Sequence, residues 1–122
     1  MEEDRSQDKY DLEERTYQFA HQVREFVKQI PRTMSNYEDS RQVIRASGSV
    51  GANYIEANES LGDKDFLLHI KISRKESKES RYWLRLLDLE AKPALEPERA
   101  RLINESIELM RIFGAIFRKR SD

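Results

Sequence analysis

The sequence predicts an all-α fold, an antiparallel up-down-up-down four-helix bundle. The chain has 122 residues, of which only 4 are Gly and 3 are Pro, while 37% are charged. That composition favours long helices over many short strands. Apolar residues recur at helical spacing in four blocks with short connections, which is typical of a bundle. We expect one domain over residues 11–118, with a frayed acidic segment at 1–10 and a basic tail at 119–122.

The first two helices are delimited by Pro31 and by a pair of glycine and aspartate residues. The first is expected from about Asp11 to Ile30, where Pro31 stops it. The second is expected to open at Ser35, which forms a capping box with Glu38, and to reach about Leu61. The residues on the buried faces are Leu12, Thr16, Phe19, Val23, Phe26, Val27 and Ile30 in the first helix, and Val43, Ala46, Val50, Tyr54, Ala57 and Leu61 in the second.

The third helix is expected to run from an N-cap at Asp63 to about Ala91. The fourth starts at Pro97, which suits the first helical position, and ends near Arg118. Acidic residues near its start and the basic run Arg118, Lys119 and Arg120 at its end match the helix macrodipole.

Two glycines lie in the middle of the second helix, at Gly48 and Gly51. Each costs about 1 kcal/mol in a helix interior, so a gain must offset them. Close approach of a neighbour is the physical candidate, and we expect a bulky side chain such as Trp83, Phe113 or Phe117 to pack there. The contact can be within the chain or with a second subunit.

The fourth helix carries more apolar residues than one stripe of a small bundle requires. Together with the small residue Ser106, the apolar residues cover more than half of the helix circumference. They are Leu102, Ile103, Ile107, Leu109, Met110, Ile112, Phe113, Ile116 and Phe117. The surplus indicates burial against another chain.

The third helix has a buried seam and a one-sided charge. The inner seam, at spacing 4-3-4-3-4, consists of Phe66, Ile70, Ser73, Ser77, Ser80 and Leu84. A basic stripe lies on another face and consists of Lys71, Arg74, Lys75, Lys78, Arg81 and Arg85. The stripe is either a solvated face that pairs with acids of a neighbouring helix or subunit, or a phosphate-contacting surface for RNA or DNA. With Tyr82 the only nearby aromatic for stacking, nucleic-acid binding would be mainly electrostatic.

Glu76 and Glu79 lie on the inward-facing side of the third helix, and we expect Arg41 or Arg45 to pair with them. A carboxylate-bridged metal site is not expected, because such bundle sites use Glu-x-x-His pairs and neither His21 nor His69 belongs to one. His21 is expected on the polar face and His69 at the edge of the core. No phosphate loop or nucleophile–base arrangement is visible, which indicates a non-enzyme without cofactors or a small-molecule substrate.

Cysteine content, the length of apolar runs and net charge further limit the classes of protein that the sequence fits. The absence of Cys excludes disulfides and thiolate-ligated zinc. No apolar run approaches the length of a membrane span, and the first residues are acidic rather than signal-like, so we expect a soluble cytoplasmic protein without a membrane partner. The net charge of −1 argues against a generic polyanion binder but not against a local stripe.

The segments QVIRASGSVGANYIEANES and FLLHIKISRKESKESRYWLRLL resemble a known family, the small bacterial four-helix-bundle proteins encoded in intervening sequences of 23S rRNA genes. The resemblance covers about Thr16 to Phe117. The family's second helix typically carries Ser-Ile-Pro-x-Asn-Ile-Ala-Glu-Gly, and Ser49, Asn53 and Glu56 match it, with Val50 for Ile and Gly51 for Pro. Glu79 matches a family Glu of the third helix, whereas Lys75 and Glu76 replace the usual Gly-Ser.

This resemblance implies a bundle that assembles as a homo-oligomer, most often a pentamer. A related branch, the accessory proteins of diversity-generating retroelements, binds nucleic acid and a reverse transcriptase. Two functions stay open at this point. One is a self-assembling bundle that binds RNA or a ribonucleoprotein through the basic stripe, and the other is a protein-binding or scaffolding oligomer without a nucleic-acid role.

Overall fold

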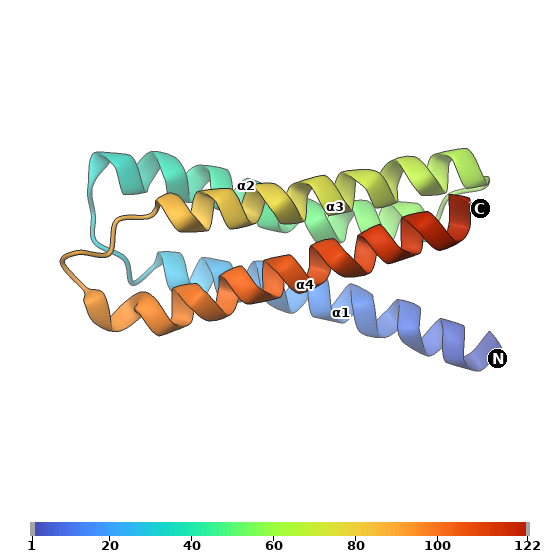
Figure 1. Cartoon of the computed structure of the whole chain (residues 1–122), viewed down its shortest axis with the longest axis horizontal. Coiled ribbons are helices and arrows are strands. Elements are labelled where there is room, and N and C mark those ends of the chain that lie inside the picture. The colour runs from blue at the N-terminus through green and yellow to red at the C-terminus, as the bar shows by residue number, and fades with distance from the viewer. Residues whose placement is uncertain (1, 122) are drawn as a thin grey trace.

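The computed structural model describes residues 2–121, and the side chains of Lys9 and of residues 11–121. Four helices account for most of this range: α1 (Glu2–Val27), α2 (Met34–Asn58), α3 (Asp63–Leu86) and α4 (Glu96–Ser121). A 3₁₀ turn, η1 (Pro93–Leu95), precedes α4. Each helix packs on the next, and α4 returns to α1, so the predicted antiparallel four-helix bundle is confirmed. Both chain ends and the α2–α3 turn lie at one end of the bundle, and the other two connections lie at the opposite end (Figure 1).

Several helix boundaries differ from those expected. Helix α1 begins at Glu2 rather than Asp11, so residues 2–10 continue the helix, and it ends at Val27, three residues before Ile30. Helix α2 ends at Asn58 rather than at Leu61, which is fully exposed. Helix α4 begins at Glu96, one residue before Pro97, and continues to Ser121.

The capping residues are also not those expected. Thr33 caps α2, because its hydroxyl accepts a hydrogen bond from the backbone N–H of Asn36 at 3.1 Å. The expected capping box of Ser35 and Glu38 is therefore wrong: Ser35 already lies inside the helix. At α3 the N-cap is Gly62, in an extended conformation, and Asp63 is the first helical residue.

Helix α3 ends at Leu86, five residues before the expected Ala91, because the chain then buries alternate residues in extended form. Leu87 and Leu89 are each 2% exposed, a spacing of two that a helix cannot bury on one face. The guanidinium group of Arg99 donates hydrogen bonds to the carbonyl oxygens of Leu84 and Leu87. It therefore satisfies acceptors that the end of a helix leaves free.

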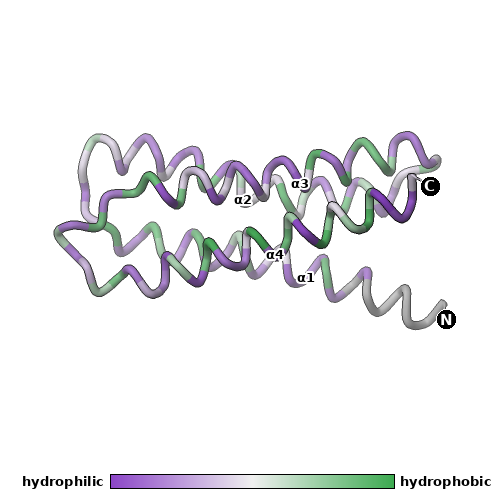
Figure 2. The backbone as a smooth tube through the Cα atoms, viewed as in Figure 1, coloured by the Kyte–Doolittle hydropathy of each residue, from purple (hydrophilic) through white to green (hydrophobic). Residues whose placement is uncertain are grey.

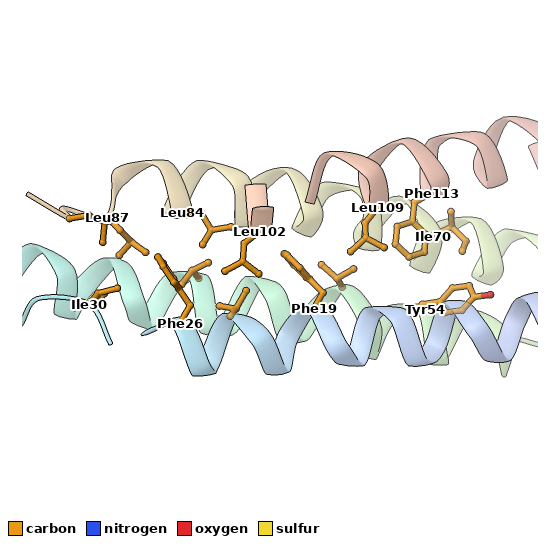
Figure 3. Packing of buried hydrophobic residues seen from close by; sticks show 14 of the residues in the cluster. Phe19, Phe26, Ile30, Tyr54, Ile70, Leu84, Leu87, Leu102, Leu109 and Phe113 are labelled. Atoms are coloured by element: carbon orange, nitrogen blue, oxygen red, sulfur yellow. The ribbon is translucent and has the colours of Figure 1, made fainter. Parts of the chain in front are cut away.

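The core runs along the bundle axis between the four helices. Figure 3 shows Phe19, Phe26, Leu102, Leu109 and Phe113 pointing inward, and all five are at most 1% exposed. Along each helix hydrophilic and hydrophobic residues alternate, so no helix is apolar all round (Figure 2). The expected buried faces of the first two helices are confirmed for most members, with Leu61 the clear exception.

Small polar residues of α3 are buried beside the apolar core. Ser73, Ser77 and Ser80 of the inner seam are all 0% exposed. The hydroxyls of Ser77 and Ser80 donate to carbonyls one turn earlier in α3, at 2.9 Å and 2.8 Å, while Ser73 donates to Val50 of α2 at 2.9 Å. These small, internally satisfied side chains let α3 approach its neighbours closely.

Candidate nucleic-acid interface

The basic stripe lies on the side of α3 that faces α4 and solvent. Lys71, Arg74, Lys75, Lys78 and Arg85 are exposed, and Arg81 is half-buried. Arg74 lies across Gly114 of α4, since a Cβ atom at Gly114 would be 3.7 Å from its Nε atom. The small residue on α4 therefore leaves room for the stem of Arg74, which places its charge at the seam of the two helices.

None of the six stripe residues pairs with a carboxylate within 4.0 Å in the part of the chain that the structure describes. Other arginines differ: Arg15 bonds Glu105 through both nitrogens at 2.8 Å, and Arg101 bonds Glu98. The Nε atom of Arg81 is buried and has no hydrogen-bond partner within the described residues. Of the two alternatives for the stripe, pairing with acids of a neighbouring helix of the same chain is therefore not found within residues 11–121.

The two acidic residues of central α3 are held on another side of the helix by Arg45. The guanidinium group of Arg45 donates to Glu76 at 2.7 Å and to Glu79 at 3.1 Å, so the expected partner is Arg45 and not the exposed Arg41. We call these three residues the Arg45 cluster. The cluster holds both carboxylates on the side of α3 that faces α2, although Lys75 of the stripe is adjacent to Glu76 in the sequence and helps to favour its charged form.

Burial and hydrogen bonding set the pKa values of the two carboxyl groups in opposite directions. Burial of Glu76, whose side chain is 8% exposed, opposes its ionisation, but hydrogen bonds with Glu79 and Arg45 outweigh burial and lower the pKa of Glu76. The hydrogen bond with Glu76, together with burial, raises the pKa of Glu79 despite Arg45. A first proton therefore binds Glu79, and Glu76 stays charged beside Arg45.

The residues that match the family motif lie on the edge between α2 and α3. The side-chain amide of Asn53 donates to the carbonyl oxygen of Ser49 at 2.9 Å, and its oxygen lies 3.1 Å from Nδ1 of His69. Glu56 is exposed one turn further along α2. Ser49 and Asn53 follow Arg45 at four-residue spacing, so these residues and the Arg45 cluster share one edge, away from the basic stripe.

The two histidines have the expected settings. His69 is half-buried, and His21 is exposed with its ring stacked on Tyr17 at 6.1 Å between centroids. Among the residues whose side chains the structure describes, no three His, Cys, Asp or Glu residues gather in a way that could hold a metal ion.

The two glycines of α2 face α1, so the prediction that Trp83, Phe113 or Phe117 packs on them is wrong. A Cβ atom at Gly51 would lie 2.8 Å from Oγ1 of Thr16, and one at Gly48 would lie 3.2 Å from a terminal nitrogen of Arg24. Phe113 instead packs against Tyr54, with ring centroids 5.6 Å apart. Close approach is thus real at Gly51, where a buried threonine of α1 fills the space that a side chain would need.

The apolar surplus of α4 is largely covered within the chain. Ile103, Ile107, Met110, Ile112, Ile116 and Phe117 are half-buried, and no residue of α4 is among the large exposed hydrophobic side chains of the described range. Those lie at Tyr17, Met34, Tyr37, Ile55, Leu61, Leu68, Tyr82 and Leu86. Apolar surface available to a partner is therefore found on α1, α2 and α3 and in the α2–α3 turn.

Fold and site together define a small all-helical bundle protein with one cationic helix face. The chain belongs to the 23S rRNA-intervening sequence protein family, whose model matches residues 8–115. This confirms the resemblance seen in the sequence.

A crystal structure from Bacteroides thetaiotaomicron, described as a protein of unknown function from the S23 ribosomal protein family, has the same fold. The TM-score is 0.78 at 24% identity, over 90% of this chain and 97% of that one. No curated protein matches the sequence. Within residues 2–121, none of the helices is both long enough and apolar enough to cross a membrane.

Proposed function

We propose that the protein is a non-enzymatic, self-assembling bundle that binds RNA or a ribonucleoprotein through the basic stripe of α3. The observation that carries the proposal is the stripe itself: six cations on one face, five of them exposed, without a carboxylate partner in the described residues. From Lys71 to Arg85 the stripe extends about 21 Å along the helix, enough to contact several phosphates of one strand. We expect the protein to act in the cytoplasm, where ribosomal RNA is made and assembled in bacteria.

Binding of this kind depends on phosphate neutralisation and carries little sequence information. Each Lys or Arg that contacts a phosphate releases condensed counterions, so affinity falls steeply with salt. Tyr82, which is 54% exposed, is the aromatic residue nearest the stripe that could stack on a base. Specificity would then come from the shape of the RNA or from the number of subunits that bind together.

The test combines RNA binding with sizing for the variant Arg74→Glu/Lys78→Glu. We expect at least about a tenfold loss of affinity at low salt, and a salt dependence with about two fewer counterions released, while the mass stays that of the wild type. The matched control is Arg32→Glu/Arg41→Glu, which changes two exposed arginines outside α3 by the same charge. The control is expected to bind RNA like the wild type.

Three results would contradict the proposal: no RNA binding by the wild type at low salt, an equal loss in the control, or dissociation of the oligomer by the stripe variant. The last result supports the other candidate, a scaffolding oligomer in which the stripe pairs with acids of a second subunit.

A further inference from the structure

Two guanidinium groups from different helices converge over Gly114 of α4. Helices α3 and α4 lie side by side and antiparallel (Figure 1), and Gly114 is buried where they meet. A Cβ atom at Gly114 would lie 3.3 Å from Nη1 of Arg118 and 3.7 Å from Nε of Arg74. The two nitrogens are therefore no more than about 7 Å apart, which is less than the Debye length at physiological salt.

These two arginines lack an acidic partner, although the other arginines of α4 have one. The paired arginines are Arg99 with Glu96, Arg101 with Glu98, Arg111 with Glu108 and Arg120 with Asp63. Arg118 and Arg74 are exposed, and within residues 11–121 neither has a carboxylate within 4.0 Å. Like charges at this separation repel each other unless an anion lies between them. An anion from outside the chain would therefore stabilise the pair.

The missing side chain at Gly114 is what permits the two arginines to converge. At 3.3 Å, an added Cβ atom would be too close to the head of Arg118 for that head to stay in place. The stem of Arg74 passes the same point, with its Cδ atom 3.9 Å from the Cβ position. Glycine is unfavourable in the interior of a helix, and at this position it leaves room for two charged groups.

We propose that Arg74 and Arg118 together hold one backbone phosphate of RNA over Gly114. The site rests on the RNA binding proposed above, and it adds α4 as a second wall of that surface. A guanidinium group presents parallel N–H donors that match phosphate oxygens. A phosphodiester has two oxygens outside the chain linkage, so each arginine can donate to one of them.

The position of the pair within the basic stripe favours a phosphate strand over a single small anion. Lys71 and Lys78 are exposed and lie about one helical turn before and after Arg74. Phosphates on either side of the held one would therefore meet further cations. A row of lysines attracts a strand without fixing its place, whereas two arginines on different helices fix one phosphate in position and orientation.

The test measures binding of a single-stranded RNA of about 12 nucleotides with a 5′-hydroxyl end, so that each of its phosphates is a backbone diester. Arg118→Gln should weaken binding at least about fivefold and reduce the number of counterions released by about one. Arg118→Lys keeps the charge but loses the planar fork, and it should still weaken binding about threefold. Both variants should keep the wild-type mass, and a changed mass would place Arg118 in a subunit contact and overturn the site.

The matched control is Lys119→Gln, which removes one charge from the next residue of α4. Lys119 is also exposed, but it lies about 100° further around the helix, away from Gly114. The control should weaken binding less than about twofold. Equal losses in Arg118→Gln and Lys119→Gln, or full affinity in Arg118→Lys, would mean that only net charge matters and would overturn the site.

The double variant Arg74→Gln/Arg118→Gln tests whether the two arginines hold the same phosphate. If they do, the second substitution costs less than the first, so the loss in the double variant is smaller than the product of the two single losses. A loss equal to that product indicates two separate phosphates and overturns the shared site. Unchanged RNA binding by Arg118→Gln overturns the site and leaves the stripe standing, whereas no RNA binding by the wild type overturns both.

Discussion

Arg45 stabilises a carboxylate that is almost fully buried, although half of its own side chain is exposed. The side chain of Glu76 is 8% exposed and that of Arg45 is 52% exposed. Replacing Arg45 with Met keeps the stem and removes the charge, which leaves Glu76 without its cation. We expect a loss of about 1–3 kcal/mol in the free energy of unfolding at pH 7, measured by urea denaturation. Arg41→Met, an exposed position of the same helix, should change it by less than about 0.5 kcal/mol.

The cost of Arg45→Met should depend on pH with a definite sign. The pKa of Glu76 is lowered in the folded protein, so its contribution to stability is present above its ordinary pKa and is lost as the pH falls through the lowered value. The difference between variant and wild type should therefore shrink under acidic conditions. Glu79 acts in the opposite sense, because its raised pKa favours the folded state at low pH and that gain disappears as the pH rises. A difference that grows on acidification would show that Glu76 is not the group that Arg45 supports.

The two glycines of α2 should respond differently to the same change. A Cβ atom at Gly51 would lie 2.8 Å from Thr16 Oγ1, and Thr16 is fully buried, so Gly51→Ala should destabilise by about 1–3 kcal/mol. At Gly48 the nearest atom is the end of the flexible Arg24 side chain, so Gly48→Ala should be neutral or stabilise by up to about 1 kcal/mol. Thermal melts of both variants test this, and Thr16→Ala should relieve part of the cost at Gly51.

At the scale of the elements, Asn36 joins two connections that are far apart in the sequence. Its side-chain amide donates to the carbonyl oxygens of Pro31 and Asp88, at 2.9 Å and 2.8 Å, and its oxygen accepts from the N–H of Asp88 at 2.8 Å. The residue is 2% exposed, so none of these groups can turn to water instead.

Asn36→Ala should therefore destabilise by about 1–3 kcal/mol in chemical denaturation. Asn36→Asp keeps an acceptor for Asp88 but cannot donate, so it should also destabilise. Ser35→Ala, one residue away and exposed, is the control and should leave stability nearly unchanged. Wild-type stability in both Asn36 variants would mean that the two connections hold together without this residue.

Helix existence and buried faces could be predicted from the sequence, whereas helix ends could not. Periodicity placed Ile70, Ser73 and Leu84 in one seam, and all three are fully buried. The cap of α2 was misplaced because Thr33 and Ser35 are both good caps, and only tertiary contacts of Asn36 select between them. The end of α3 depends on Arg99, thirteen residues after Leu86, and no local signal announces that contact.

At the scale of the whole molecule, the property to measure is self-assembly. We expect a homo-oligomer, most often a pentamer by resemblance to the family, visible by light scattering at micromolar concentration as a mass of about five protomers. The large exposed apolar side chains of the described residues, among them Tyr17 and Ile55 at 60% and 47%, lie on α1, α2 and α3 and in the α2–α3 turn rather than on α4, so we expect the contacts there. A mass of one protomer under these conditions would exclude self-assembly.

The candidate site could be predicted in part from the sequence, whereas the burial of the apolar residues of α4 could not. Charge on an exposed helix face follows directly from spacing, so the stripe was visible in the sequence. The sequence narrowed the partner of Glu76 and Glu79 to Arg41 or Arg45, and the structure shows Arg45. A helical wheel of α4 shows how much of its circumference is apolar, but it does not show how much of that surface the neighbouring helices cover. Side chains such as Arg74, whose stem lies over Gly114, cover part of that surface from another helix.

The two ends of the bundle should differ in how readily they open. At one end Asn36 ties two connections together, and Lys92 adds a hydrogen bond to the carbonyl oxygen of Gln29 at 2.9 Å. Open pockets of similar size lie at both ends, about 460 Å³ beside Asn36 and about 490 Å³ beside Leu12 and Ile112, so packing alone does not distinguish them. The other end carries both chain termini, and local unfolding begins most readily at chain ends. Backbone amides beside the termini should therefore exchange their hydrogens with solvent sooner than those around Phe26 and Leu102, so that the chain loosens from its two ends while the tied connections still hold the four helices together.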